Sequence, residues 1–253
     1  MRFGTDNTMN SFNLNILFED NALIICEKPV GVLSEPDEKG NPDIVTMVSE
    51  YLSAATGKPA KVFLVHRLDR GVGGLMVLSK KEAMTAKLSQ LIQNHNFTKE
   101  YLAVVHNVPE ESEAVLKDLL FKDSSKNKSF VVTRPRKGTK EASLEYRLLE
   151  TAEYNGSPVS LLRIKLHTGR THQIRVQFSS RRMPLIGDGK YGSKDNHCEI
   201  ALFSHRLCFE HPFTHKTVDV SLLPKKDVCP WNLFSEITQP SLTPSTNPCG
   251  SQA

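Results

Sequence analysis

The chain has 253 residues, of which 39% are hydrophobic and 24% charged, a balance typical of a globular protein with a substantial core. No apolar run approaches the ~20 residues of a membrane span, and no apolar signal core follows Met1, so we expect a soluble, cytoplasmic protein. The formal net charge of +4 permits nucleic-acid binding but does not by itself predict it.

Hydrophobic periodicity predicts a mixture of strands and helices. In chain order we expect strands at 16–18 and 22–26, a helix at 43–55, a strand at 75–78, a helix at 81–95, strands at 97–105 and 159–167, a helix at 171–180, and strands at 201–209 and 217–220. Ser79 precedes Glu82 by three residues, which predicts a capping box at the start of the second helix. Strands outnumber helices without regular alternation, so the pattern indicates an α+β fold.

The two ends differ in composition from the rest of the chain. Residues 1–13 are polar and unpatterned, and residues 236–253 are rich in Pro, Ser and Thr. Because such segments bury little apolar surface, we expect flexible tails on either side of one domain at 14–235.

The cysteines and histidines are scattered along the chain. No Cys-x-x-Cys pair occurs, so we expect reduced thiols at Cys26, Cys198, Cys208, Cys229 and Cys249. None of the nine histidines falls in a recognisable metal-ligand spacing. The sequence therefore predicts no metal site.

Basic residues concentrate in two segments. Between Lys122 and Lys140 a single acid, Asp123, accompanies seven basic residues, and we interpret this stretch as a basic loop or ribbon. A second group lies further on, at Arg170, Arg175, Arg181 and Arg182. Either segment is compatible with a solvated surface or with contacts to phosphate groups.

The most informative motif is His66-Arg67-Leu68-Asp69-Arg70, in which one carboxylate lies between two arginines before a glycine-rich turn and an apolar strand. Such a carboxylate is a candidate catalytic group, and the alternative is a structural ion-pair cluster at a strand end. A protein-kinase catalytic loop is excluded, because Leu68 interrupts the motif and the other kinase motifs are missing from the sequence.

A second motif, at residues 166–175, is rich in hydrogen-bond donors. Arg170 leaves the predicted strand where a turn can aim it into a cleft, whereas Arg175 points about half a helical turn away, so we expect different partners for them. A capped turn with a solvated helix is the alternative interpretation. Tyr101 forms a third feature, although a tyrosine in a strand is commonly a core or rim residue.

Together these residues resemble the RluA-type RNA pseudouridine synthases. The shared elements occur in the family's order at His66–Asp69, Lys99–Tyr101, Thr168–Arg175 and Gly187–Gly192, with further matches near the opening residues 16–31 and at 205–212. The resemblance covers roughly residues 14–224. It implies the catalytic domain alone, with a largely antiparallel mixed sheet, flanking helices and a central catalytic cleft.

The resemblance also implies roles for individual residues. Asp69 would be the catalytic group, Tyr101 would stack beneath the target uracil, and Arg170 would pair with Asp69 to hold it ionised and oriented. Leu185 and Ile186 would form apolar walls that exclude water. The remaining substrate-binding candidates are His66, Arg67, Arg70, Thr168, His172 and Arg175, of which Arg67 would fill the space left by the flipped-out nucleotide.

The resemblance implies RNA as partner and no cofactor, and we expect a monomer. One departure concerns Gly71-Val72-Gly73-Gly74, where many family members have hydroxyl-bearing residues, so the RNA target is less well defined than the activity. Ribosomal RNA is favoured over transfer RNA. The alternatives are a non-catalytic RNA-binding protein and a glycoside hydrolase, which would need a second carboxyl group. Asp188 is the nearest suggestion, although its Gly-Asp-Gly setting is more typical of a turn residue.

Overall fold

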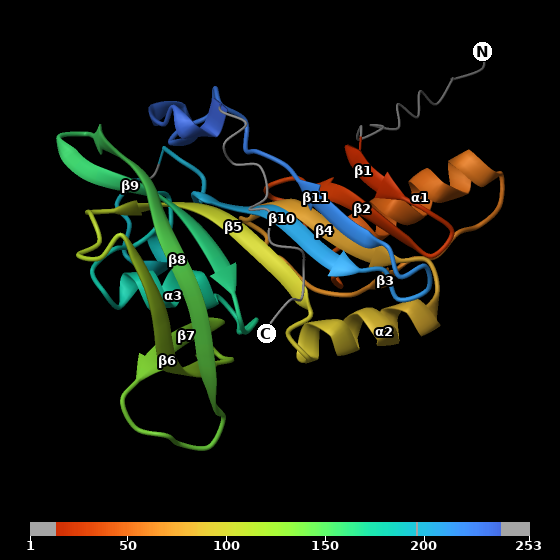
Figure 1. The fold of residues 1–253 in the computed structure, drawn as a ribbon, viewed down its shortest axis with the longest axis horizontal. Helices are drawn as coiled ribbons and strands as arrows, with labels where there is room; N and C mark the ends of the chain where they lie inside the picture. The colour runs from red at the N-terminus through yellow and green to blue at the C-terminus, as the bar shows by residue number, and fades with distance from the viewer. Residues whose placement is uncertain (1–13, 196, 239–253) are drawn as a thin grey trace, which may run out of the picture.

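The computed structural model describes residues 14–195 and 197–238. Its strands form one sheet in the order β1-β2-β4-β10-β5-β9-β8-β6-β7, with β3 beside β4 and β11 beside β10 (Figure 1). The strands are β1 (Ile16–Glu19), β2 (Leu23–Lys28), β3 (Phe63–Leu64), β4 (Gly73–Ser79), β5 (Phe97–His106), β6 (Glu113–Asp123), β7 (Lys128–Val132), β8 (Thr139–Tyr154), β9 (Ser157–Leu166), β10 (Leu202–Glu210) and β11 (Thr217–Ser221). Among the described strands only β4 and β10 pair in parallel. The expected α+β fold with a largely antiparallel sheet is confirmed.

The helices are α1 (Ile44–Thr56), α2 (Glu82–Gln93) and α3 (Gln173–Ser179), with short 3₁₀ helices η1 (Gly189–Tyr191), η2 (Trp231–Leu233) and η3 (Glu236–Thr238). The Asp43 carboxylate accepts a hydrogen bond from the Thr46 amide at 2.9 Å and so caps α1. The predicted capping box of α2 is wrong. Ser79 is still part of β4 and its hydroxyl donates to the Lys81 carbonyl, while Lys81 is the residue that precedes the helix.

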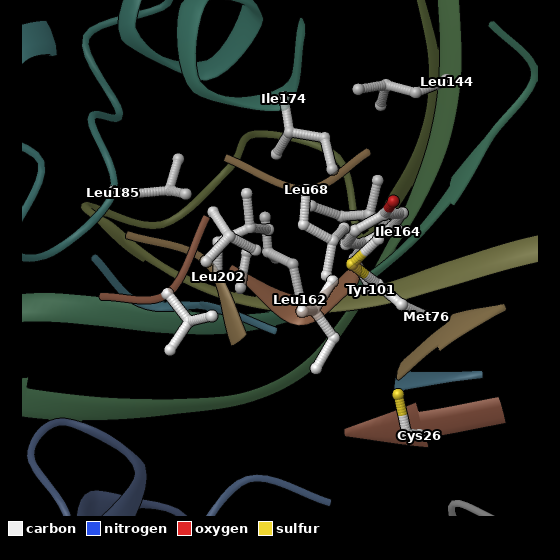
Figure 2. Packing of buried hydrophobic residues seen from close by; sticks show 14 of the residues in the cluster. Cys26, Leu68, Met76, Tyr101, Leu144, Leu162, Ile164, Ile174, Leu185 and Leu202 are labelled. Atoms are coloured by element: carbon white, nitrogen blue, oxygen red, sulfur yellow. The ribbon is translucent and has the colours of Figure 1, made fainter. Parts of the chain in front are cut away.

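Side chains of the central strands alternate between the two faces of the sheet. In β2, Ile24 and Cys26 join a cluster with α1 and α3, whereas Leu23 and Ile25 join a second cluster with α2. All seven residues of β4 are buried, so this strand lies in the centre of the packed layers. Figure 2 shows Tyr101 among the apolar side chains of the first cluster. This cluster forms the floor beneath the candidate site described below.

The strands β3, β6, β7 and β8 are missing from the sequence expectations, and the last three carry the basic stretch 122–140. This stretch comprises the end of β6, all of β7 and the start of β8, so it is a ribbon with turns rather than one loop. The Arg136 guanidinium lies 3.6 Å from the centre of the Phe121 ring. These three strands lie together at one side of the molecule (Figure 1).

The expectation of reduced cysteines is wrong for one pair. Cys198 and Cys229 form a disulfide with their Cα atoms 5.9 Å apart, although 31 positions separate them in sequence. The fold brings the two segments together, which the spacing of cysteines along the chain does not reveal. Cys26 and Cys208 are buried free thiols, and Cys249 lies outside the described residues.

The predicted boundary of the C-terminal tail falls within ordered structure. Residues 236–238 form η3, and Ile237 is buried in a cluster with Trp231 and Phe234. The remainder of both predicted tails lies outside the described residues. Within the part of the chain that the structure describes, no helix is long and apolar enough to cross a membrane.

Candidate active site

A cleft of about 1010 Å³ opens beside the first apolar cluster. Its walls come from the segment 64–72, the start of β5 and the segment 165–175, which follows β9 into α3. Asp69, Tyr101 and Arg175 all line it. The two motifs, separated by about a hundred residues in sequence, therefore meet in one cleft, as the sequence predicts.

The loop that carries Asp69 is held by backbone hydrogen bonds on both sides. The Ser34 hydroxyl accepts from the Leu68 amide at 3.0 Å and donates to the Leu68 carbonyl at 2.7 Å. The Asp69 carbonyl accepts from the Val72 amide at 3.0 Å, which closes a tight turn. Asp69 is thus presented on fixed backbone, and its side chain is 29% exposed.

Lys28 contacts this loop through the Arg70 carbonyl, 3.5 Å from its ammonium, and is absent from the sequence candidates. Its fully buried ammonium donates to the carbonyls of Val32 at 2.7 Å and Pro29 at 2.9 Å. Burial lowers the pKa of Lys28 to about 8, and the charge of Asp69 opposes that shift.

The glycine-rich turn after Asp69 has a packing explanation. Gly74 has φ = 110°, and a Cβ added there would overlap the backbone of Ser204 on β10. A Cβ on Gly73 would lie 3.0 Å from a Val30 methyl group. Small residues here allow β10 to pair closely with β4, the strand that follows the turn carrying Asp69.

The ion-pair partner of Asp69 is Arg175 rather than the predicted Arg170. Arg175 Nη1 donates to Asp69 Oδ2 at 2.8 Å, while Nε and Nη2 donate to the two oxygens of Asp188 at 2.7 and 2.8 Å. Arg170 is exposed, and its Nε donates to the Glu141 carbonyl at 2.9 Å. Arg175 lies in α3, which directs its side chain inward, whereas Arg170 lies in the turn before the helix at the rim.

Asp188, read as a turn residue in the sequence, is a fully buried anchor for this arginine. Burial alone would lower the pKa of Arg175, but the hydrogen bonds and charges of Asp188 and Asp69 outweigh it and raise that pKa. The guanidinium is therefore a fixed cation held between two carboxylates. Because Asp188 occupies both its oxygens with Arg175, it is unsuited to the second-carboxyl role of a glycoside hydrolase.

His172 and Tyr191 form a further layer around the ion pair. The Arg175 guanidinium lies 5.1 Å from the centre of the Tyr191 ring, and the Tyr191 hydroxyl contacts His172 Nδ1 at 3.0 Å. His172 Nε2 lies 3.8 Å from Asp69 Oδ2. Burial lowers the pKa of His172, and the charge of Asp69 opposes that shift. His172 thus lies beside Asp69 at the start of α3.

Tyr101 forms part of the cleft floor and is 5% exposed. Burial raises the pKa of its phenol, and the negative charge of Asp69 adds to the shift. Tyr101 therefore presents a protonated phenol at neutral pH.

The prediction that Leu185 and Ile186 form apolar walls of the site is wrong. Leu185 and Ile186 are fully buried, and neither lines the cleft, because Leu185 packs in the first cluster and Ile186 in the cluster around Trp231. The aliphatic and phenylalanine side chains that line the cleft are Leu64, Val65, Leu68, Val72, Ile92, Phe97, Leu166, Ile174 and Leu202.

The other candidates divide into exposed and supporting residues. Arg67 is exposed at the rim, where its guanidinium contacts Glu35 at 2.6 Å, and Arg70 is exposed with Nε donating to the Gly31 carbonyl. His66 lines the cleft and accepts a hydrogen bond from the Val77 amide, and burial together with the Lys99 charge lowers its pKa to about 3. Thr168 donates to the Gln173 side chain and thereby supports the turn.

Gln173 organises this turn and is also missing from the sequence candidates. Its amide oxygen accepts from the Arg170 backbone at 3.0 Å, and its Nε2 donates to the Ser143 carbonyl on β8 at 3.1 Å. Among the described residues, no group of three or more His, Cys, Asp or Glu side chains is arranged to hold a metal ion.

This geometry can be compared with known proteins. A sequence profile described as RNA pseudouridylate synthase matches residues 22–180, which include Asp69, Tyr101 and Arg175. The chain belongs to this family. The expected membership of the RluA-type synthases is confirmed by relatives named as ribosomal large subunit pseudouridine synthases C and D.

Two curated relatives illustrate the similarity of this synthase to the family. It is 33% identical over 222 residues to the ribosomal large subunit pseudouridine synthase D of Zymomonas mobilis, covering 81% of this chain and 68% of that protein. It is 30% identical over 208 residues to an uncharacterized RNA pseudouridine synthase of Bacillus subtilis, with 81% and 67% covered. The chain thus spans about two thirds of the length of these relatives.

A solved structure supports the fold. Human RNA pseudouridylate synthase domain containing 1 matches 89% of this chain and 87% of its own with a TM-score of 0.69 at 22% identity. Family members isomerise uridine to pseudouridine in RNA.

Proposed function

We propose that this chain isomerises uridine in RNA with Asp69 as the group that acts at the sugar. The arrangement around Asp69 carries the proposal. Arg175 fixes Oδ2, whereas Oδ1 has no hydrogen-bond partner among the described residues. One oxygen is therefore oriented, and the other faces a cleft large enough for a nucleoside.

The reaction needs no change in oxidation state and no energy source. The bond between uracil N1 and ribose C1′ breaks, a bond between C5 and C1′ forms, C5 loses its proton and N1 gains one. Asp69 can attack C1′ or assist departure of the base, and both routes require an ionised, oriented carboxylate. Arg175, held by Asp188, supplies that orientation.

Tyr101 would act first as a stacking surface for the uracil. Its ring lies in the cleft floor, where an apolar contact below the base limits the access of water. Because its phenol is protonated at neutral pH, it could remove the C5 proton only if another group first took its own proton. Tyr101→Phe separates the two roles, since unchanged turnover would rule out the hydroxyl.

We favour ribosomal RNA as the substrate. The support is that several similar proteins are named ribosomal large subunit pseudouridine synthases. Exposed basic side chains at the rim, among them Arg67, Arg170 and Lys122, would contact phosphates. Arg67 precedes Asp69 by two residues, and its exposed side chain would leave its ion pair with Glu35 to enter the space of a flipped-out nucleotide. Monomeric state and cytoplasmic location stay predictions.

Mapping pseudouridines in stable RNAs from cells with and without this protein tests the function. We expect at least one ribosomal RNA site to disappear with the gene and to return with the wild-type chain but not with Asp69→Asn. A missing site in transfer RNA alone would correct the substrate class. An unchanged map would favour the non-catalytic RNA-binding alternative.

A further inference from the structure

Lys99 is a buried cation in the cleft to which the function described above assigns no task. It lies on β5 two residues before Tyr101, is 8% exposed, and lines the same cleft. Side chains two positions apart on a strand point to the same face and lie roughly 7 Å apart along it. Lys99 and Tyr101 therefore enter the cleft from the same face of β5.

The charge of Lys99 is uncompensated by the protein. Within residues 14–195 and 197–238, no carboxylate lies within 4.0 Å of its Nζ, and no hydrogen bond of that group is formed. Burial lowers the pKa of Lys99 accordingly. The other buried cations of the fold differ, because Arg175 and Arg206 each contact two carboxylates and Lys28 contacts backbone carbonyls.

The ammonium lies close to the turn that precedes α3. A Cβ added to Gly169 would lie 3.6 Å from Lys99 Nζ, so the ammonium lies directly under the turn between β9 and α3. The absence of a side chain at Gly169 leaves this approach open. Arg170 follows at the rim of the same turn, and His66 is close enough for the Lys99 charge to lower its pKa.

We propose that the Lys99 ammonium binds one of the two phosphodiesters that flank the target uridine and thereby positions the ribose against Asp69. This inference rests on the proposed function. A bound phosphodiester would supply the counter-charge that the protein withholds, and it would belong to the nucleotide whose base stacks on Tyr101 in the same cleft. Lys99 would thus orient the nucleotide, while the rim cations would contribute affinity without fixing its position.

A double-mutant cycle between protein and RNA tests the assignment. The variants are Lys99→Met and, as a matched control, Lys122→Met, which removes an exposed lysine at the cleft rim. The RNAs are short hairpins around the mapped uridine, carrying a neutral methylphosphonate on its 5′ or its 3′ side, each compared with the charged parent. Single-turnover kcat/KM is measured for every pair, and thermal melts establish that both variants are folded.

We expect Lys99→Met to lower kcat/KM on the charged RNA by about 10- to 100-fold. One of the two methylphosphonates should lower wild-type turnover similarly and have little further effect on Lys99→Met. For Lys122→Met the losses should multiply. Lys99→Met removes a buried charge that no protein group compensates, so the melting temperature of this variant should not fall below that of the wild type.

Two outcomes would overturn the assignment: unchanged turnover by Lys99→Met, or losses that multiply for both methylphosphonates. In either case an active wild type would leave the proposed function intact. If the wild type converts no RNA, the proposed function fails, and the Lys99 assignment falls with it.

Discussion

Replacing Arg175 by lysine tests which arginine of the second motif, Arg170 or Arg175, orients Asp69. The Arg175 side chain is 6% exposed and holds Asp188, which is fully buried, through two bonds and Asp69 through a third. A lysine ammonium is a point charge and cannot contact both carboxylates in this geometry. We expect the loss of one or two charge-assisted bonds, at about 1.5–3 kcal/mol each, so Arg175→Lys should lower the free energy of unfolding by about 1.5–6 kcal/mol.

The same change should release Asp69 from its orientation. A loss of about 2.7 kcal/mol in transition-state stabilisation corresponds to roughly a 100-fold fall in single-turnover rate. Arg170→Lys is the matched control, because the Arg170 side chain is exposed and, among the described residues, hydrogen-bonds only to the Glu141 carbonyl. It should change the free energy of unfolding by less than about 0.5 kcal/mol and leave the rate at saturating RNA unchanged.

Urea denaturation measures the first quantity, and release of tritium from RNA labelled at uridine C5 measures the second. Arg175→Lys should be tested at a temperature where it is folded. The reasoning is refuted if Arg170→Lys loses the chemical step while Arg175→Lys retains it.

Three further predictions concern the floor, the turn and the pH dependence. Tyr101→Phe should retain the free energy of unfolding to within about 1 kcal/mol, and its single-turnover rate then reports the role of the hydroxyl. Gly74→Ala should destabilise the fold by more than about 2 kcal/mol in urea, because its Cβ would overlap the Ser204 backbone, whereas Gly189→Ala meets open space and should cost far less. The pKa of His66 is about 3 in the folded chain and has an ordinary value of 6.5. Between pH 6.5 and about 3, the unfolded chain therefore binds a proton at His66 that the folded chain does not bind. The free energy of unfolding should therefore fall with decreasing pH across this window, by at most ~1.4 kcal/mol per pH unit because a single proton is involved, and His66→Gln should reduce that slope. The pH prediction is contradicted if His66→Gln has the same slope as the wild type. The other two are contradicted if Gly74→Ala is destabilised by less than about 2 kcal/mol, or if Tyr101→Phe is unfolded.

Local patterns predicted the elements whose periodicity is clean. The helix α1 and the central strands β4 and β5 carry uninterrupted apolar faces, and the structure confirms them. The strands β6 and β8 escaped prediction because charged residues interrupt their alternation along most of their length. The ribbon that they form with β7 is stabilised by pairing between distant residues, which a local pattern does not contain.

The candidate site was predicted in its parts but not in its pairing. The motifs placed Asp69, Tyr101 and Arg175 in one cleft, yet the choice between Arg170 and Arg175 depends on where α3 begins. Because α3 begins at Gln173, Arg175 lies in the helix and points inward, whereas Arg170 lies in the preceding turn. Asp188 was read as a turn residue because a Gly-Asp-Gly sequence describes the backbone and not the buried partner of its side chain.

The burial of Lys99 and Lys28 is also missing from the sequence predictions. Both are long polar side chains that a sequence pattern assigns to the surface, and both are buried beside the Asp69 loop. Lys28 ends β2 and Lys99 lies in β5, and both strands belong to the central part of the sheet, with β4 and β10 between them.

The most direct test of the central claim compares the wild type with Asp69→Asn on one RNA that contains the mapped uridine. Asparagine preserves the shape of the side chain and removes its charge, so RNA binding should stay within a few-fold of the wild type. The account predicts that the wild type forms pseudouridine in a single turnover and that Asp69→Asn forms none while binding normally. Formation of pseudouridine by Asp69→Asn at the wild-type rate would contradict it.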